Sequence, residues 1–219
     1  MHTEPLDNGR FVLVDYTCTF GTDAVLLSEF VRAHTATRVC DLGTGCGILP
    51  LLWHTKEHAP AVDAVELSAH VAALARASVE QNGLCTHITV WEQDWCSLSL
   101  PHGTYDLVTC NPPYFAVGSG KVCPDPDRRL ARHETSTTLT DITAAAYRLL
   151  KNGGRFCLCH RPERMADVLR ALQDGGFAPA RLQLVHARTD KAPFLLLCEA
   201  VKGGTNRLSV LPPHILESR

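Results

Sequence analysis

The chain reads RVCDLGTGCG from Arg38 to Gly47, where an apolar run typical of a buried strand passes directly into a glycine-rich turn. Gly43, Gly45 and Gly47 leave no side chains where the backbone would approach a ligand. In an open α/β sheet such a turn lies at the carboxyl edge, which is where ligands bind. The spacing departs from the dinucleotide fingerprint, because the third glycine follows the second after two residues rather than three. The stretch therefore predicts a ligand site and disfavours an NAD-dependent oxidoreductase.

Strand-like and helical patterns alternate along the rest of the chain. This alternation predicts an α/β fold, in which a doubly wound and mostly parallel sheet carries helices on both faces. Seven strands are expected, at Arg38–Gly43, Val62–Glu66, Ile88–Trp91, Tyr105–Cys110, Arg155–Cys159, Leu182–Ala187 and Pro193–Val201. Helices are expected at Thr22–Val31, Cys46–Thr55, between Ser68 and Gly83, at Leu139–Leu150 (stopped by Asn152-Gly153-Gly154) and at Pro162–Asp174. No repeat or linker divides the chain, so residues 1–219 are predicted to form a single domain whose N-terminal segment and first helix span 1–36.

Composition excludes several classes of protein. The chain has 219 residues, 45% of them hydrophobic and 20% charged, with a net charge of −2, which is unlike collagen-like, disordered or membrane-spanning sequences. No apolar run is long enough for a membrane helix, and the N-terminus lacks the plan of a secretory signal. The ten cysteines form no C-x-x-C pair, which argues against zinc and disulfide frameworks. We therefore expect a soluble, cytoplasmic protein with buried free thiols, no metal and no membrane contact.

The two halves of the chain carry opposite charge. Residues 1–120 hold 5 Lys and Arg against 13 Asp and Glu, whereas residues 121–219 hold 16 against 10. A basic half can attract the phosphate backbone of a nucleic acid, although solvated helix faces give the same count.

Three carboxylates follow three consecutive predicted strands. Glu66 lies 25 residues after Asp41, where it can accept hydrogen bonds from both hydroxyls of a ribose. Asp94 follows the third strand and can accept from an adenine amino group, with Trp95 beside it as an apolar wall. Together with the glycine turn, these acids predict a cofactor that contains a nucleoside.

The tetrapeptide Asn111-Pro112-Pro113-Tyr114 follows the fourth strand at the same edge. Neither proline has an N–H, so pairing stops there and the carbonyl of Pro112 is left without a local partner. With the side-chain oxygen of Asn111, this turn offers two acceptors for the hydrogens of a conjugated amine, and Tyr114 can stack on the planar group. Accepting both hydrogens stabilises the positive charge that develops when the nitrogen attacks an electrophile. The alternative is a proline turn that merely ends a strand.

These motifs and several short phrases resemble one family. The turn at Asp41–Gly47, Glu66, Asp94 and Asn111–Tyr114 together resemble class I S-adenosylmethionine-dependent methyltransferases that methylate amines. Further phrases narrow the resemblance to tRNA1(Val) adenine N6-methyltransferases, which modify the adenine beside the anticodon; they are FGTDAVLL at Phe20–Leu27, ARHE at Ala131–Glu134, His160-Arg161-Pro162 and Gly203-Gly204. The resemblance extends from about Gly9 to the C-terminus.

The resemblance implies a Rossmann-like seven-stranded sheet with an antiparallel C-terminal strand, S-adenosylmethionine as cofactor and an RNA substrate, most naturally tRNA. The implied catalytic residues are Asn111, Pro112 and Tyr114. The implied cofactor-binding residues are Thr22, Asp41, Gly43, Gly45, Glu66, Asp94 and Asn111. The implied substrate-binding residues are Asp23, Tyr114, Lys121, Arg128, Arg129, Arg132 and His133, with His133 and Glu134 alternatively anchoring the loop.

Residues 116–136 lack any helical or strand period and are rich in Gly, Pro, Asp and Arg. A loop of this length in a compact domain is either functional or disordered, and its departure from Tyr114 favours a substrate loop that clamps phosphates. Few residues precede Gly9, so we expect the catalytic domain itself to capture the RNA.

Other functions remain open at this point. Release-factor glutamine N5-methylation uses the same tetrapeptide on a carboxamide, but only about 37 residues precede the first sheet strand, where that family carries a helical domain. A DNA adenine methyltransferase would need a target-recognition domain after the catalytic one. A protein that binds cofactor and RNA without turnover is a third alternative. The sequence leaves the oligomeric state open.

Overall fold

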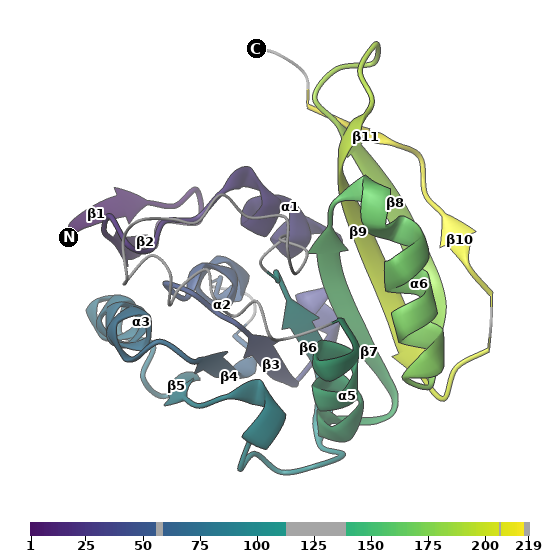
Figure 1. The fold of residues 1–219 in the computed structure, drawn as a ribbon. Coiled ribbons are helices and arrows are strands. Elements are labelled where there is room, and N and C mark those ends of the chain that lie inside the picture. The colour runs from purple at the N-terminus through teal and green to yellow at the C-terminus, as the bar shows by residue number, and fades with distance from the viewer. Residues whose placement is uncertain (56–58, 113–138, 206, 217–219) are drawn as a thin grey trace, which may run out of the picture.

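The computed structural model describes residues 1–55, 59–112, 139–205 and 207–216. In this part of the chain one sheet of nine strands forms the centre of the molecule, in the order β10-β8-β9-β7-β6-β3-β4-β5 with β11 also paired to β8 (Figure 1). Its strands are β3 (Arg38–Leu42), β4 (Ala61–Glu66), β5 (Ile88–Glu92), β6 (Tyr105–Cys110), β7 (Leu150–His160), β8 (Phe177–His186), β9 (Pro193–Lys202), β10 (Ser209–Val210) and β11 (His214–Ile215). The seven predicted strands are confirmed, and two short strands extend the sheet beyond β8.

The chain leaves the centre of the sheet in two directions. Strands β3 to β7 are mutually parallel, whereas β9 is antiparallel to both β7 and β8. Strand β3 lies between β4 and β6, so the chain adds β4 and β5 on one side of it and then crosses back to add β6 and β7 on the other. The carboxyl end of β3 is therefore the switch point of the sheet, and the glycine turn begins there.

Helices cover both faces of the sheet, as the alternating pattern predicts. Side chains alternate along each strand, so Val39 and Leu107 belong to one apolar cluster while Cys40 and Val108 belong to the other. The first cluster is covered by α1 (Thr22–Phe30), α2 (Ile48–Trp53) and α3 (Ala69–Gln81), and the second by α5 (Leu139–Leu149) and α6 (Met165–Asp174). Single 3₁₀ turns are η1 (Ala33–Thr35), η2 (Trp95–Ser97) and η3 (Pro162–Arg164). The side-chain oxygen of Ser68 accepts from the backbone N–H of Val71 at 3.5 Å and so caps the start of α3.

Strand β7 begins earlier than the sequence pattern predicts. The glycines at 153 and 154 do not end the helix region in a loop; they belong to a strand that starts at Leu150. Leu150 pairs with Tyr105 and Arg155 pairs with Leu107, so the register shifts between them. Gly153 has a φ of 77°, which a bulge tolerates and a regular strand does not. The bulge takes up the extra residues and lets the strand continue.

An N-terminal hairpin was not predicted. Strands β1 (His2–Pro5) and β2 (Phe11–Val14) pair antiparallel and pack outside the main sheet. The backbone N–H of Leu13 donates to the hydroxyl of Ser78 on α3 at 2.9 Å, and the Asn82 side chain donates to the carbonyl of Phe11 at 2.7 Å. These contacts with α3 and the residue that follows it, together with the burial of Val12 and Val14 in the apolar core, hold the hairpin in place.

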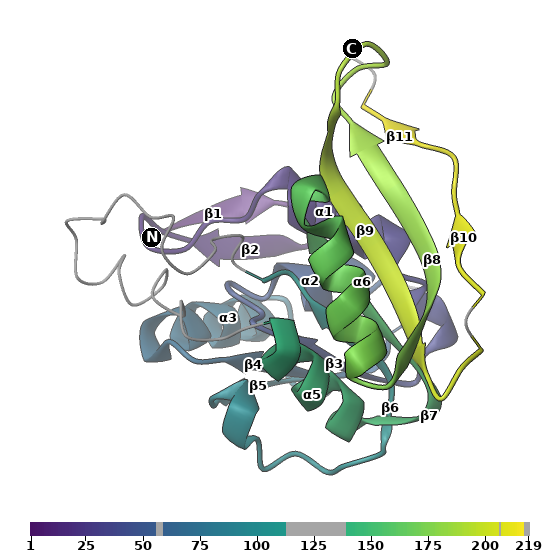
Figure 2. The same ribbon diagram turned by 45° about the vertical axis from the view of Figure 1, so that its right-hand side comes forward.

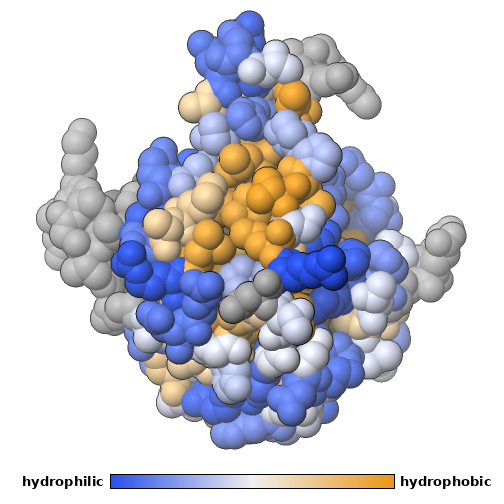
Figure 3. All heavy atoms as spheres, turned by 90° about the vertical axis from the view of Figure 1, so that its right-hand side faces the viewer, coloured by the Kyte–Doolittle hydropathy of each residue, from blue (hydrophilic) through white to orange (hydrophobic). Residues whose placement is uncertain are grey.

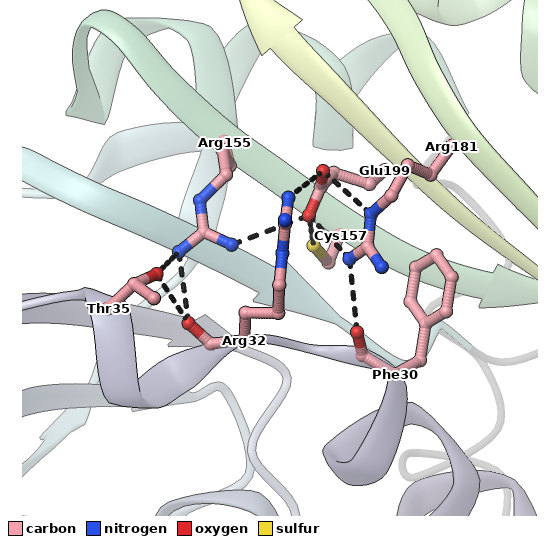
Figure 4. A network of polar contacts seen from close by, with 7 residues as sticks. All are labelled: Phe30, Arg32, Thr35, Arg155, Cys157, Arg181 and Glu199. Atoms are coloured by element: carbon pink, nitrogen blue, oxygen red, sulfur yellow. Dashed lines mark hydrogen bonds and ion pairs between the residues drawn. The ribbon is translucent and has the colours of Figure 1, made fainter. Parts of the chain in front are cut away.

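A buried charge cluster joins α1 to the antiparallel end of the sheet. Glu199 on β9 is 2% exposed and accepts from Arg32 at 3.0 Å, Arg155 at 3.4 Å and Arg181 at 2.8 Å. Figure 4 shows the three guanidinium groups converging on this carboxylate. Burial alone would raise the pKa of Glu199, but the hydrogen bond from Arg181 and the three positive charges hold that pKa below its ordinary value. Arg181 also donates to the carbonyl of Phe30 at 3.1 Å, which fixes the end of α1.

The C-terminal segment covers the outer edge of the sheet. In Figures 1 and 2, β10 and β11 run along β8, with which they pair in parallel. Apolar side chains gather on this side of the molecule (Figure 3), and Leu208 and Val210 are exposed there. Pro212 and Pro213 interrupt the segment between the two strands, and neither can donate a hydrogen bond to a further strand.

Candidate active site

The three predicted acids lie at neighbouring strand ends. Asp41 is the penultimate residue of β3, Glu66 is the last residue of β4, and Asp94 lies two residues beyond β5. Because β3, β4 and β5 are adjacent and parallel, these carboxylates share one edge of the sheet with the glycine turn. This placement agrees with the predicted nucleoside site.

The glycine turn packs tightly against the sheet. Gly43, Gly45 and Gly47 have φ of 70°, 58° and 85°, a region that residues with a Cβ rarely adopt. A Cβ on Gly43 would lie 2.8 Å from the ring of Trp95, so no side chain fits there. Trp95, predicted to be a wall beside the adenine, is buried with its ring against Gly43. The fold of the turn therefore requires these glycines, whether or not a ligand approaches them.

Glu66 connects the glycine turn to the start of α3. Its Oε2 accepts from the backbone N–H of Gly45 at 3.0 Å, and its Oε1 accepts from the backbone N–H of Ser68 at 2.9 Å. Burial raises the pKa of Glu66, and these backbone hydrogen bonds partly oppose that rise. Each carboxylate oxygen can accept a second bond, so Glu66 can hold ribose hydroxyls while it holds the turn.

Asp41 is a buried carboxylate with one unpaired oxygen. Its Oδ1 accepts from the hydroxyl of Thr109 at 2.6 Å, while its Oδ2 has no hydrogen-bond partner among the described residues. Burial raises the pKa of Asp41 to about 7. Positive charge brought near a buried carboxylate stabilises its ionised form.

This pKa gives a prediction about stability. Between pH 4 and pH 7 the folded chain holds a proton on Asp41 that the unfolded chain has lost, so the stability of the ligand-free protein falls as pH rises. The free energy of unfolding falls across this range in the wild type. In the Asp41→Asn variant the fall should be smaller by roughly 2–4 kcal/mol. Urea unfolding of both proteins at pH 5 and pH 8 measures the difference. Equal pH dependence in the two proteins would contradict the assignment.

A second turn, from Asp15 to Cys18, lies next to the glycine turn and was not predicted from the sequence. Asp15 is buried and accepts from the backbone N–H of Thr17 at 2.8 Å and from the imidazole Nε2 of His70 at 2.7 Å. Burial opposes ionisation, but these hydrogen bonds keep the pKa of Asp15 well below its usual range. The Sγ of Cys18 lies 3.7 Å from where a Cβ of Gly45 would be. An Asp side chain often accepts from the backbone N–H two residues later, so the Asp15-Tyr16-Thr17 sequence could have predicted this turn.

Two residues predicted to bind ligands follow this turn. Thr22 and Asp23 form the first turn of α1, where Thr22 is exposed and Asp23 is half-buried. Their roles stay predictions. Asp94 is exposed, and its Oδ1 accepts from the backbone N–H of Cys96 at 2.9 Å, so it also begins η2.

Asn111 and Pro112 follow β6 beside the glycine turn. Cys110, the last residue of β6, pairs with Leu42, which immediately precedes Gly43. Asn111 is half-buried and Pro112 is buried, and the Sγ of Cys159 lies 3.0 Å from the Oδ1 of Asn111. The predicted substrate loop 116–136 lies outside the described residues, as do Tyr114, Lys121, Arg128, Arg129, Arg132 and His133.

Comparisons with known proteins show the family of the chain. The family model described as methyltransferase small domain matches residues 17–174. A Tolumonas auensis protein named tRNA1(Val) (adenine(37)-N6)-methyltransferase is 33% identical over 178 residues, which are 81% of this chain and 73% of that protein. The chain belongs to the family of tRNA1(Val) (adenine(37)-N6)-methyltransferases.

Other relatives carry the same name, and solved methyltransferase structures share the fold. The protein of the same name from Parabacteroides distasonis is 30% identical over 82% of this chain and 75% of its own length, and the one from Aeromonas salmonicida is 37% identical over 68% and 61%. A predicted O-methyltransferase from Agrobacterium tumefaciens shares the fold with a TM-score of 0.69 and 25% identity, over 88% of this chain and 86% of that one. Geranyl diphosphate methyltransferase in complex with S-adenosylmethionine has a TM-score of 0.61 at 16% identity, over 83% and 84%.

S-adenosylmethionine is the cofactor of the family, and the residues present fit it. The glycine turn lets a ligand approach its backbone, Glu66 offers carboxylate oxygens for a ribose, and the unpaired Oδ2 of Asp41 suits a positively charged ligand.

Within the described residues no group of three or more His, Cys, Asp or Glu side chains is arranged to hold a metal ion. No helix in the same residues is long and apolar enough to cross a membrane. None of the nine described cysteines forms a disulfide, and six of them are buried, as predicted.

The role of Glu66 can be tested against a matched neighbour. Glu66→Gln puts an amide N–H where the carboxylate accepts from Gly45 or Ser68, and should weaken S-adenosylmethionine binding roughly 10- to 100-fold. Glu92 pairs with Glu66 across the strands but is exposed and contacts Arg76, so Glu92→Gln is the control. Calorimetric titration with the cofactor compares the two. Similar affinities in both variants would rule out a cofactor contact for Glu66.

Proposed function

We propose that this chain transfers the methyl group of S-adenosylmethionine to the exocyclic N6 amine of an adenine in tRNA, next to the anticodon. The observation that carries the proposal is the position of Asn111 and Pro112, directly after β6 and beside the glycine turn. The names of the curated relatives support the substrate class. The basic balance of residues 121–219 suits an RNA partner.

The chain contributes orientation and electrostatics to this reaction. S-adenosylmethionine would supply a methyl group on a sulfonium, so that formation of the bond from the amine nitrogen to the methyl carbon breaks the carbon–sulfur bond, releases a neutral thioether and is completed by loss of one amine proton to solvent. The side-chain oxygen of Asn111 and the carbonyl of Pro112 accept the two hydrogens of the target amine. These contacts favour a pyramidal nitrogen and stabilise the positive charge that develops on it. The role of the protein is to hold the amine in line with the methyl group. The transfer is direct and forms no covalent intermediate with the protein.

The base must leave its stack to reach this edge of the sheet. Adenines in RNA loops are often unstacked already, which lowers the free energy needed for extrusion. We propose that Tyr114 stacks on the base and that Lys121, Arg128, Arg129 and Arg132 bind the flanking phosphates, with His133 near them. We further propose that residues 1–219 act as one domain and that the protein works in the cytoplasm, where tRNA is abundant and free thiols persist.

A substrate competition tests this function against glutamine methylation and against binding alone. The purified chain is incubated with labelled S-adenosylmethionine, unmodified total tRNA and a peptide release factor in one reaction. Label in the tRNA fraction, with N6-methyladenosine as the labelled nucleoside, is the expected result. Label in the release factor would favour glutamine N5-methylation. Cofactor binding without label in either macromolecule would favour a binding protein.

A further inference from the structure

The side chain of Asn111 is held by a cysteine on the next strand. Cys159 is the penultimate residue of β7, and its thiol donates to the Oδ1 of Asn111 at 3.0 Å. The two residues are 48 apart in sequence and meet because β6 and β7 are parallel neighbours, with Cys110 paired to Leu158. Cys159 is fully buried, whereas Asn111 is half-buried at the edge of the site.

This contact selects one orientation of the asparagine amide. A carboxamide can rotate by about 180°, which exchanges its oxygen acceptor with its NH₂ donor. The thiol is a donor and favours the rotamer that turns the oxygen towards it. Because a carboxamide oxygen accepts two hydrogen bonds, the bond from Cys159 still permits one from a target amine. In the rotated form the NH₂ group would face the amine hydrogens and oppose binding.

We infer that Cys159 is a positioning residue, which keeps the Oδ1 of Asn111 directed at the target amine. This inference rests on the proposed function, since Asn111 is the acceptor for the amine there. The thiol itself does not touch substrate in this assignment. It raises the fraction of enzyme in which Asn111 is correctly oriented when substrate arrives, so its loss lowers kcat.

Substitutions at Cys159 separate orientation from packing. Cys159→Val fills the space without a donor and should lower kcat roughly 3- to 10-fold, the effect of one neutral hydrogen bond. Cys159→Ser keeps a donor and should recover most of that loss. Cys157 lies two residues earlier on β7, is also fully buried and has its thiol 3.6 Å from the Oε2 of Glu199. Cys157→Ser is therefore the matched control, with kcat close to that of the wild type.

A double-mutant cycle completes the test. If Cys159 acts through Asn111, Cys159→Val should have no further effect on kcat in an Asn111→Ala background. A large effect of Cys159→Val in that background, equal loss in Cys159→Val and Cys159→Ser, or wild-type kcat in Cys159→Val would each overturn the inference. The proposed function fails separately, if the wild type does not methylate adenine or if Asn111→Ala retains full kcat.

Discussion

Asn111→Ala is expected to lower kcat for adenine methylation by roughly 10²–10³, because in the proposed mechanism Asn111 is the oriented acceptor that stabilises charge developing at the attacking nitrogen. We expect truncation at Asn111 to keep the pairing of β6 with β3, since the residue follows the last paired position of the strand. The rate is measured at saturating cofactor and saturating tRNA, so that the chemical step is compared rather than binding.

Two controls accompany this variant. Asn111 was also predicted to lie near the cofactor, so its affinity for S-adenosylmethionine is titrated separately, and thermal unfolding checks that the fold is retained. A fall in cofactor affinity alone would make Asn111 a binding residue only. Near-wild-type turnover with intact cofactor binding would remove the tetrapeptide from the mechanism.

Glu199→Gln should destabilise the protein by roughly 2–4 kcal/mol, which lowers Tm by about 5–15 °C for a chain of this size. The substitution removes the only negative charge among the three arginines drawn with it in Figure 4. Arg155 and Arg181 are mostly buried and would keep their charges without a carboxylate partner, whereas Arg32 can turn to solvent. We therefore expect less than the full effect of a completely buried pair.

Arg32→Gln is the matched control for this cluster. The Arg32 side chain is half-exposed, so its ion pair with Glu199 should contribute less than about 1 kcal/mol. Chemical denaturation of both variants at pH 7 gives the comparison. Equal destabilisation in the two proteins would contradict the smaller contribution of Arg32, and no destabilisation in Glu199→Gln would show that the cluster does not stabilise the junction of α1 with the sheet.

The central sheet and the acids at its edge were predictable because their signals are local. Apolar runs alternating with helical periods define parallel strands, and the glycine turn after Arg38–Leu42 marks the switch point. Glu66 and Asp94 follow from the positions of the next two strand ends. Each of these inferences needs only the neighbouring residues.

The missed features depend on contacts between distant segments. Strands β1 and β2 are four residues each, too short for a clear period, and the hairpin contacts Ser78 on α3 and Asn82 just after that helix. The bulge at Gly153 is set by the register of β7 on β6. The contact between Cys159 and Asn111 depends on that same register, and no motif connects the two residues in the sequence.

One measurement tests the central claim most directly. The purified chain is incubated with S-adenosylmethionine carrying a deuterated methyl group and an unmodified tRNA transcript, and the RNA is then analysed by nuclease mapping and nucleoside mass spectrometry. We expect the deuterated methyl group on N6-methyladenosine, in the oligonucleotide that contains the adenine beside the anticodon. A deuterated methyl group on another atom or nucleoside, or no transfer by a protein that binds the cofactor, would contradict the proposed reaction.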